Sequence, residues 1–287
     1  MKIGKHEIGN GKPVFVIAEI GINHNGDLEL AKKLITAAKQ TGCDAVKFQK
    51  RTIEVVYTPA ELANPRENPF GPTNGDLKRG LEFSLEAYKK IDCFCKEQDI
   101  IWFASPWDEA SVDFLEQFNV PCHKIAASSL TDAGLLKHIK DIGKPLILST
   151  GMSELSEIDK AVEILGKNNL ALMHCVSQYP ATPENINLYA MQTLKDRYNV
   201  PVGYSGHELD TIISTVAVGM GACIVERHFT LDRNLWGSDH KASIEPIEME
   251  EMVKNIRMLE EALGDPVPRC LPVEIPTKEK LRRVDSI

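Results

Sequence analysis

Short apolar runs alternate with amphipathic segments along nearly the whole chain. In the segment 28–40, for example, Leu30, Leu34, Ile35 and Ala38 recur at helical spacing and mark one face. The pattern predicts strands over 14–20, 45–49, 100–104, 123–127, 145–149, 170–175, 201–204 and 223–229. It predicts helices over 28–40, 85–97, 108–118, a segment capped by Thr131 or Asp132, 154–165, 187–198, 210–218 and 246–263.

Strands that are apolar along their whole length are typical of a parallel sheet covered by helices. Eight strand–helix units favour a closed (β/α)8 TIM barrel over an open, doubly wound sheet. Residues 1–13, with Asn10-Gly11 between short extended pieces, predict an N-terminal β-hairpin that plugs the barrel bottom. We expect one barrel domain over 1–287, with this hairpin, a long functional loop at 58–72 and a tail at 266–287.

Composition narrows the class of protein only a little. The 287 residues include 43% hydrophobic and 26% charged ones, as in soluble globular proteins. The formal net charge of −8 argues against nucleic acids and anionic membranes as partners, although a basic pocket for a small anion is expected. Seven cysteines without a CxxC pair, and no apolar signal or membrane span, predict a reduced cytoplasmic protein.

Three cations lie inside otherwise apolar strands, where a barrel places its reactive side chains near the strand ends. Lys47, Lys124 and Arg227 each need an anion, because an unpaired buried charge is costly. Two readings stay open at this point. The anions are either protein carboxylates such as Glu19 and Glu226, or the carboxylate and phosphate of a ligand.

Two histidines end neighbouring strands. His207 and His228 are therefore placed to converge on one divalent cation, with water and substrate in the open positions. Two imidazoles with oxygen ligands suit Mn²⁺, Zn²⁺ or Fe²⁺. His24, His174 and His240 also lie near the predicted top of the barrel, but we do not expect them to be ligands.

Several longer motifs together resemble those of the sialic acid synthase family, in the right order from about residue 13 to 285. They are Ile17-Ala18-Glu19-Ile20-Gly21-Ile22-Asn23-His24-Asn25-Gly26, Val46-Lys47-Phe48-Gln49, Leu148-Ser149-Thr150-Gly151-Met152, Glu226-Arg227-His228-Phe229-Thr230 and Ser238-Asp239-His240-Lys241-Ala242-Ser243. Members of this family condense phosphoenolpyruvate with N-acetylmannosamine or a related sugar aldehyde. The resemblance implies a transferase that releases phosphate and forms a sialic-acid-like 2-keto sugar acid.

The resemblance also implies roles for single residues. Catalytic roles fall to Glu19, which would manage a proton or water, and to the phosphoenolpyruvate-binding Lys47 and Lys124. Substrate-binding roles fall to Gln49, Asn74, Ser177, Tyr179, Ser205 and Asp239. His207 and His228 would bind the divalent cation, with Mn²⁺ expected and Mg²⁺, Zn²⁺ or Co²⁺ as alternatives. The cation would polarise the sugar aldehyde for attack by the enol carbon.

Two departures from the family concern the acceptor sugar. The family motif Gly-Ser-Gly-Glu after the lysine of strand 4 reads Ala126-Ala127-Ser128-Ser129 here, so Ser129 stands where a sugar-binding Glu is usual. The sequence ends at Ile287, about where a C-terminal antifreeze-like module begins in bacterial relatives. We expect the condensation to be kept, the acceptor to be altered, and the barrel to self-associate as related barrels do.

Rival functions remain. Lys47 or Lys124 would serve as the nucleophile of a Schiff-base aldolase if its pKa were low enough. A metal-dependent hydrolase is disfavoured, because the early His-x-His of many such barrels is replaced by Asn23-His24-Asn25. A degenerate sugar-binding barrel without turnover is the non-enzymatic alternative.

Overall fold

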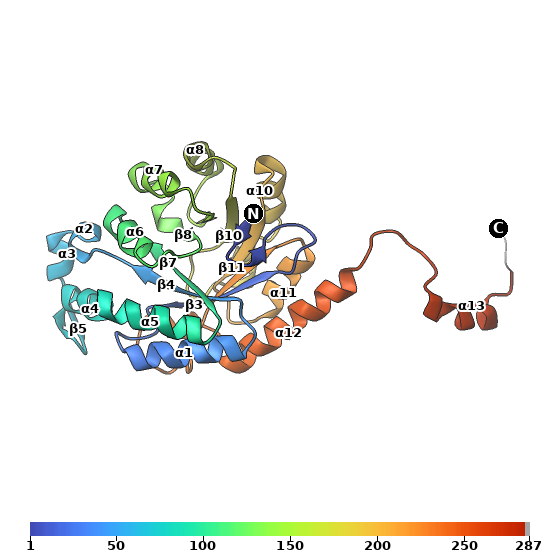
Figure 1. Cartoon of the computed structure of the whole chain (residues 1–287), viewed down its shortest axis with the longest axis horizontal. Helices are drawn as coiled ribbons and strands as arrows, with labels where there is room; N and C mark the ends of the chain where they lie inside the picture. The colour runs from blue at the N-terminus through green and yellow to red at the C-terminus, as the bar shows by residue number, and fades with distance from the viewer. Residues whose placement is uncertain (285–287) are drawn as a thin grey trace.

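Eight parallel strands form the centre of the molecule, shown in Figure 1 as a computed structural model that describes residues 1–284. They are β3 (Phe15–Gly21), β4 (Ala45–Lys50), β7 (Ile101–Pro106), β8 (His123–Ile125), β9 (Leu146–Ser149), β10 (Leu170–Cys175), β11 (Val202–Gly206) and β12 (Ile224–His228). Their order in the sheet is β7-β4-β3-β12-β11-β10-β9-β8, and β7 and β8 lie next to each other. The predicted TIM barrel is confirmed.

Helices between the strands surround the barrel. They are α1 (Leu28–Gln40), α5 (Leu85–Glu97), α6 (Glu109–Glu116), α7 (Ala133–Ile142), α8 (Leu155–Leu165), α10 (Ala190–Tyr198), α11 (Ile212–Gly219) and α12 (Pro246–Leu263). In α1 the predicted face packs inward, with Leu34, Ile35 and Ala38 buried, whereas Leu30 is half-buried. Asp27 begins this helix by accepting hydrogen bonds from the backbone nitrogens of residues 29 and 30.

The long segment between β4 and α5 differs from the plain loop that its prolines predict. It holds α2 (Ile53–Val56), α3 (Pro59–Ala63), the antiparallel pair β5 (Pro65–Asn68) and β6 (Gly71–Thr73), and α4 (Asn74–Leu81). Capping boxes start two of these helices, formed by Thr58 with Glu61 and by Thr73 with Asp76. A shorter helix, α9 (Pro183–Ile186), follows β10, and the 3₁₀ turns η1 (Ala127–Ser129) and η2 (His240–Ala242) follow β8 and β12.

The N-terminal hairpin exists, but its turn lies elsewhere than predicted. β1 (Lys2–Ile3) pairs antiparallel with β2 (His6–Glu7), so the chain turns at Gly4-Lys5 and not at Asn10-Gly11. Gly4 has a φ of +55°, and an added Cβ would lie 2.8 Å from the Ile101 side chain. Because the hairpin packs this closely against the start of β7, and Ile3 is buried, it plugs the barrel bottom as expected.

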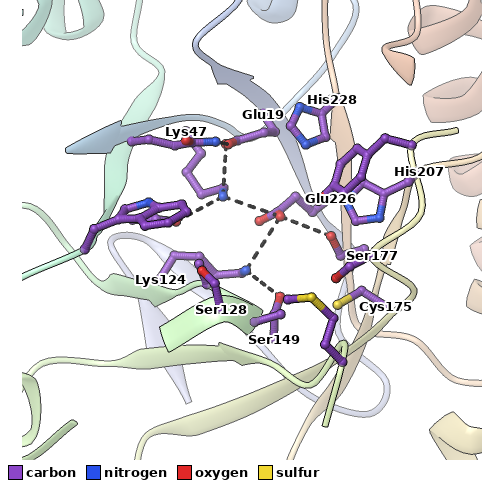
Figure 2. Close-up of a pocket in the computed structure, with 18 residues that line it drawn as sticks. Glu19, Lys47, Lys124, Ser128, Ser149, Cys175, Ser177, His207, Glu226 and His228 are labelled. Carbon is purple, nitrogen blue, oxygen red and sulfur yellow. Dashed lines mark hydrogen bonds and ion pairs between the residues drawn. The ribbon is translucent and has the colours of Figure 1, made fainter. Parts of the chain in front are cut away.

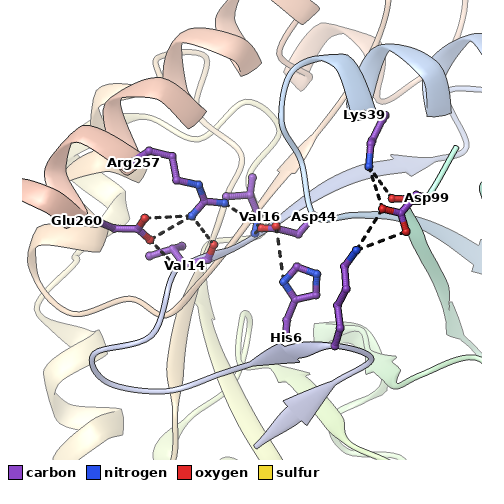
Figure 3. A network of polar contacts seen from close by, with 9 residues as sticks. His6, Val14, Val16, Lys39, Asp44, Asp99, Arg257 and Glu260 are labelled. Carbon is purple, nitrogen blue, oxygen red and sulfur yellow. Dashed lines mark hydrogen bonds and ion pairs between the residues drawn. The ribbon is translucent and has the colours of Figure 1, made fainter.

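A polar network ties α12, the last helix of the barrel, to the start of β3, the first strand of the barrel, at the barrel bottom (Figure 3). Arg257 of α12 donates hydrogen bonds to the carbonyl oxygen of Val14, at 2.8 Å, and to the Asp44 carboxylate, at 3.1 Å. Asp44 also accepts a 2.8 Å hydrogen bond from the backbone nitrogen of Val16. The Val14 backbone nitrogen donates to Glu260 of α12. The two ends of the barrel sequence are therefore held together by side chains as well as by strand pairing.

The segment after α12 extends away from the barrel (Figure 1). It contains the 3₁₀ turn η3 (Pro272–Glu274) and α13 (Ile275–Leu281), and its described side chains are exposed. Residues 266–284 of the predicted tail lie in this segment, and the last three residues of that prediction lie outside the described part. Nowhere in residues 1–284 does a helix have the length and apolar content that crossing a bilayer requires.

Candidate active site

A cavity of about 260 Å³ opens at the carboxyl ends of the barrel strands (Figure 2). Nine of the eleven predicted site residues line it: Glu19, Lys47, Gln49, Lys124, Ser177, Tyr179, Ser205, His207 and His228. Asn74 and Asp239 do not line it. The structure therefore gathers side chains from all eight barrel strands and their following loops around one space.

Lys47 lies on the floor of the cavity between two carboxylates. Its Nζ is 3.0 Å from Glu19 Oε2 and 3.5 Å from Glu226 Oε1, and it donates a 3.1 Å hydrogen bond to Ser105. Burial alone would lower the pKa of Lys47, but the two glutamates outweigh it and the pKa is raised. Lys47 therefore keeps its proton and acts as a fixed positive charge.

Lys124 faces Lys47 across the same Glu226. Its Nζ donates a 2.6 Å hydrogen bond to Ser149 and lies 3.7 Å from Glu226 Oε1. Burial lowers the pKa of Lys124. Lys124 has only Glu226 nearby to counteract this effect, whereas Lys47 has both Glu19 and Glu226. With two lysines facing two glutamates, the floor carries balanced charges and not the net positive charge that we expected.

Glu19 is held by a glycine and a glutamine. Its Oε1 accepts a 3.0 Å hydrogen bond from Gln49 Nε2. Gly21 has a φ of +53°, and a Cβ there would lie 3.0 Å from Glu19 Oε1 and 3.1 Å from Gln49 Nε2. The glycine in this motif thus leaves room for the carboxylate to turn back against its own strand.

His207 and His228 lie on the wall of the cavity with their ring centroids 5.4 Å apart. His207 Nδ1 donates a 2.7 Å hydrogen bond to the carbonyl oxygen of Val176, which leaves Nε2 as the basic nitrogen. Burial, helped by His228, lowers the pKa of His207 to about 3, so this imidazole is neutral at physiological pH. The Nδ1 of His228 is buried, and nothing in residues 1–284 hydrogen-bonds to it.

These observations fit a divalent cation held by the imidazoles of His207 and His228. A lone pair on His207 Nε2 and an unpartnered nitrogen on His228 are the groups that such an ion requires. Within residues 1–284 no cluster of three or more His, Cys, Asp or Glu side chains is arranged as a metal site. The protein would therefore supply two ligands, and water and substrate would supply the others.

Tyr179 lines the cavity at its exposed rim, whereas Asp239 and Asn74 are not among the lining residues. The Tyr179 ring is half exposed, with its centroid 4.2 Å from that of His207. Asp239 is outside the lining, yet it is close enough to contribute to raising the pKa of Tyr179, which burial raises most. Ser129 is buried away from the cavity, and its neighbour Ser128 lines it instead.

Asn74 lies in the segment between β4 and α5 and is engaged there. Its side chain accepts a 3.3 Å hydrogen bond from Arg66 and donates one of 3.2 Å to the carbonyl oxygen of Glu61. In this arrangement Asn74 stabilises its own segment. A sugar contact by Asn74 stays a prediction.

Arg227 points away from the cavity and pairs with a carboxylate that the sequence did not suggest. Its NH1 lies 3.1 Å from Glu208 Oε1, whereas its chain neighbour Glu226 faces the two lysines. Side chains alternate along a strand, so 226 and 228 face inward and 227 faces outward. Arg227 therefore pairs with a carboxylate of the protein, which was one of the two alternatives, and its partner is Glu208 instead of Glu226.

Sequence reasoning missed several residues that complete the cavity. Ser105 and Ser149 hold the two lysines, and Trp107, Ser128, Met152 and Cys175 form further parts of the wall. Glu226 was noted only as an alternative anion. The sequence signal for Glu226 was its position two residues before His228. Side chains alternate between the two faces of a strand, so Glu226 faces the cavity if His228 does.

A barrel with this cavity defines the class of (β/α)8 enzymes that act at the carboxyl ends of their strands. Comparison with known proteins gives the family. Residues 34–268 match the model of the NeuB family. The human N-acetylneuraminate-9-phosphate synthase is 39% identical over 96% of this chain and 78% of its own. The N,N'-diacetyllegionaminic acid synthase of Legionella pneumophila is 40% identical over 96% and 80%.

A solved structure agrees with these relatives. The N-acetylneuraminic acid (sialic acid) synthetase of Leptospira borgpetersenii, in complex with citrate, superposes with a TM-score of 0.85. It is 34% identical and covers 99% of this chain and 98% of its own. The chain belongs to the NeuB family, which confirms the resemblance seen in the motifs and the prediction of a sialic acid synthase-like transferase.

Proposed function

We propose that this protein condenses phosphoenolpyruvate with the open-chain aldehyde of an N-acetylmannosamine-like amino sugar, giving a sialic-acid-like 2-keto sugar acid and phosphate. One observation carries the proposal. Lys47 and Lys124, which are suited to an anion, share a single cavity with the neutral imidazole of His207 and with His228. The relatives named as sialic and legionaminic acid synthases support this reaction.

The floor of the cavity would bind phosphoenolpyruvate. Lys47 and Lys124 bind its phosphate and carboxylate, exchanging part of their contact with Glu226 for the ligand. Ser205, which donates a 3.1 Å hydrogen bond to Glu226 Oε1, turns toward the phosphate together with Ser177. Because the lysines are fixed before binding, the ligand meets an organised site at little cost in entropy.

The sugar would enter from the rim, near Tyr179 and Asp239, with its aldehyde toward His207 and His228. His207 and His228 would hold a divalent cation, with Mn²⁺ as our first choice, which would supply Lewis acidity to the aldehyde. Gln49 keeps the Glu19 carboxylate in place beside the reacting groups.

The reaction forms one C–C bond and one C–O bond and breaks the C–O bond to phosphate. C3 of phosphoenolpyruvate forms a bond to the aldehyde carbon, whose oxygen becomes a hydroxyl by taking a proton. Water adds through its oxygen to C2 and gives up one proton. The C2–O bond to phosphate then breaks while the new C2 hydroxyl gives its proton to the departing phosphate, leaving a keto group and inorganic phosphate. We assign to Glu19, which lines the cavity, the role of taking this proton from water and returning it to the aldehyde oxygen.

A phosphate-release assay with phosphoenolpyruvate, Mn²⁺ and a panel of acceptors tests the proposal. The panel should contain N-acetylmannosamine, its 6-phosphate, a diacetylated 6-deoxy sugar and plain aldoses. Release with an amino sugar, and not with phosphoenolpyruvate alone, supports the proposal. Binding of a sugar without turnover of any acceptor would favour the degenerate binding barrel.

The Schiff-base aldolase keeps one observation in its favour, the lowered pKa of Lys124. Borohydride trapping with pyruvate separates the two enzymes, because the condensation forms no imine. We expect no adduct on Lys124.

We also propose that the protein is located in the cytoplasm. The seven cysteines are all free thiols, which is usual in a reducing compartment.

A further inference from the structure

A buried network lies directly behind the two cavity histidines, on the outer side of the barrel wall. Glu208 follows His207 in the chain, and Arg227 precedes His228. Glu208 and Arg227 form an ion pair of 3.1 Å, and each has an exposed fraction of 3% or less. A salt bridge thus joins the chain neighbours of the two residues that we expect to bind the cation.

Every group around this ion pair contributes to its geometry. Arg227 donates to the carbonyl oxygens of Glu208 and Asp210, the latter at 3.1 Å, and to Ser214 of α11 at 3.0 Å. Tyr204 of β11 donates a 2.8 Å hydrogen bond to the second oxygen of Glu208. The pair therefore links β11, β12 and α11, and Tyr204, Ser214 and the pair itself are buried, whereas Asp210 is exposed.

A glycine makes this arrangement possible. A Cβ on Gly206 would lie 2.7 and 2.8 Å from the two carboxylate oxygens of Glu208. The carboxylate therefore folds back over the end of β11, against the residue that precedes His207. Its position is fixed relative to that strand and to the neighbouring one.

His228 depends on this support more than His207 does. The ring of His207 is oriented by its hydrogen bond to Val176, whereas Nδ1 of His228 has no partner within residues 1–284. Its placement follows from the backbone of β12, and Arg227 anchors that backbone to the end of β11. Histidine ligands in metal sites usually have such support from a hydrogen bond of their own.

We propose that Glu208 and Arg227 are positioning residues, which hold His207 and His228 at the spacing that one divalent cation needs. Neither residue touches the cavity, and neither is a ligand. The inference rests on the cation site of the proposed function and adds a second layer of residues to it. Weakening the pair should lower cation affinity by about 10–100-fold, the usual effect of losing outer-shell support.

The test is a titration of the chelator-stripped, full-length protein with Mn²⁺, following free Mn²⁺ by electron paramagnetic resonance. Glu208→Gln removes the charge but keeps the size, and Arg227→Lys keeps the charge but loses the forked contacts. Tyr204→Phe is the mild variant, which removes only one hydrogen bond and should give a smaller loss in the same direction. Thermal unfolding and phosphoenolpyruvate binding in chelator are measured in parallel.

Arg257→Gln is the matched control. It also breaks an arginine–carboxylate contact, a half-buried one at the opposite end of the barrel. Weaker Mn²⁺ binding by the Glu208 and Arg227 variants, with Arg257→Gln and phosphoenolpyruvate binding unchanged, supports the positioning role. Wild-type affinity in Glu208→Gln and Arg227→Lys, or an equal loss in Arg257→Gln, overturns it.

Failure of the proposed function itself looks different. If wild-type protein and His207→Ala bind Mn²⁺ equally, the histidines are not its ligands, and both the cation site and this inference are wrong. If only the positioning variants behave as wild type, the cation site stands and the inference alone is wrong.

Discussion

Glu19 and Lys47 lie 3.0 Å apart as a nearly fully buried ion pair at the floor of the cavity, in neighbouring strands β3 and β4. Such a pair is stable only while both charges are present, since removing one leaves the other buried and unpaired. The pair therefore prepares a positive charge for an incoming anion at a fixed place.

Replacing either floor lysine should abolish turnover. We expect Lys47→Ala and Lys124→Ala each to lower phosphate release by about 10²–10³-fold or more, because a preorganised charge at the reacting group is lost. Lys144→Ala is the control, since Lys144 pairs with Glu116 outside the cavity. Activity of Lys47→Ala within a few-fold of wild type would contradict the role of the floor.

Removing the cation should have the same effect as removing its ligands. We expect chelator to abolish phosphate release, and Mn²⁺ to restore it in wild type but not in His207→Ala or His228→Ala. His138→Ala, at a partly exposed histidine paired with Asp113, should respond as wild type does. Full activity of extensively chelated enzyme would show that the reaction needs no cation.

The free energy of unfolding should decrease as the pH is lowered, because the folded protein keeps His24 neutral. His24 is buried and stacks on Phe83 with centroids 4.1 Å apart, and burial lowers its pKa to about 3. Between pH 6.5 and about 3 the unfolded chain binds a proton that the folded chain does not. This group alone should therefore reduce stability by up to about 1.4 kcal/mol per pH unit as pH falls through that window.

The variant His24→Asn isolates this contribution. Asparagine can still accept the hydrogen bond that His24 Nδ1 takes from the backbone nitrogen of Gly26, at 3.0 Å, but it does not titrate. Urea unfolding at pH 7 and pH 5 should show a smaller loss of stability in the variant than in wild type. Equal losses would mean that His24 titrates normally in the folded protein.

Breaking the network at the barrel bottom should affect stability and leave the chemistry unchanged. Arg257→Gln removes the contact to Asp44 and weakens the one to Val14, so we expect a loss of about 1–3 kcal/mol. Thermal or urea unfolding measures it, with phosphate release at low temperature as the companion assay. A loss of activity larger than the unfolded fraction explains would contradict this assignment.

The barrel was predictable from sequence because its strands and helices carry strong, regular signals. α1, α5 and α12 have the predicted bounds, as does β10. The segment between β4 and α5 was not predictable in the same way. Its helices are short and depend on capping boxes, and its prolines suggested an irregular loop.

The candidate site was predictable where a charged residue interrupts an apolar strand or ends it. Lys47, Lys124 and His228 are of this kind, and the structure places them around one cavity. The partner of Arg227 was not predictable, because Glu208 reaches it only by folding back over Gly206. Contacts that cross between strands depend on the register, which a single sequence does not give.

The pairing of β3 with β12 has a consequence for the order in which the chain folds. β3 ends at Gly21, yet one of its edges stays unpaired until Ile224–His228 have been synthesised. Val14 can form its hydrogen bond with Arg257 only after that residue has been added as well. During synthesis the first strand is thus completed by nearly the last part of the barrel. Closure is a late event between distant parts of the chain, and contacts of such long range make folding slow.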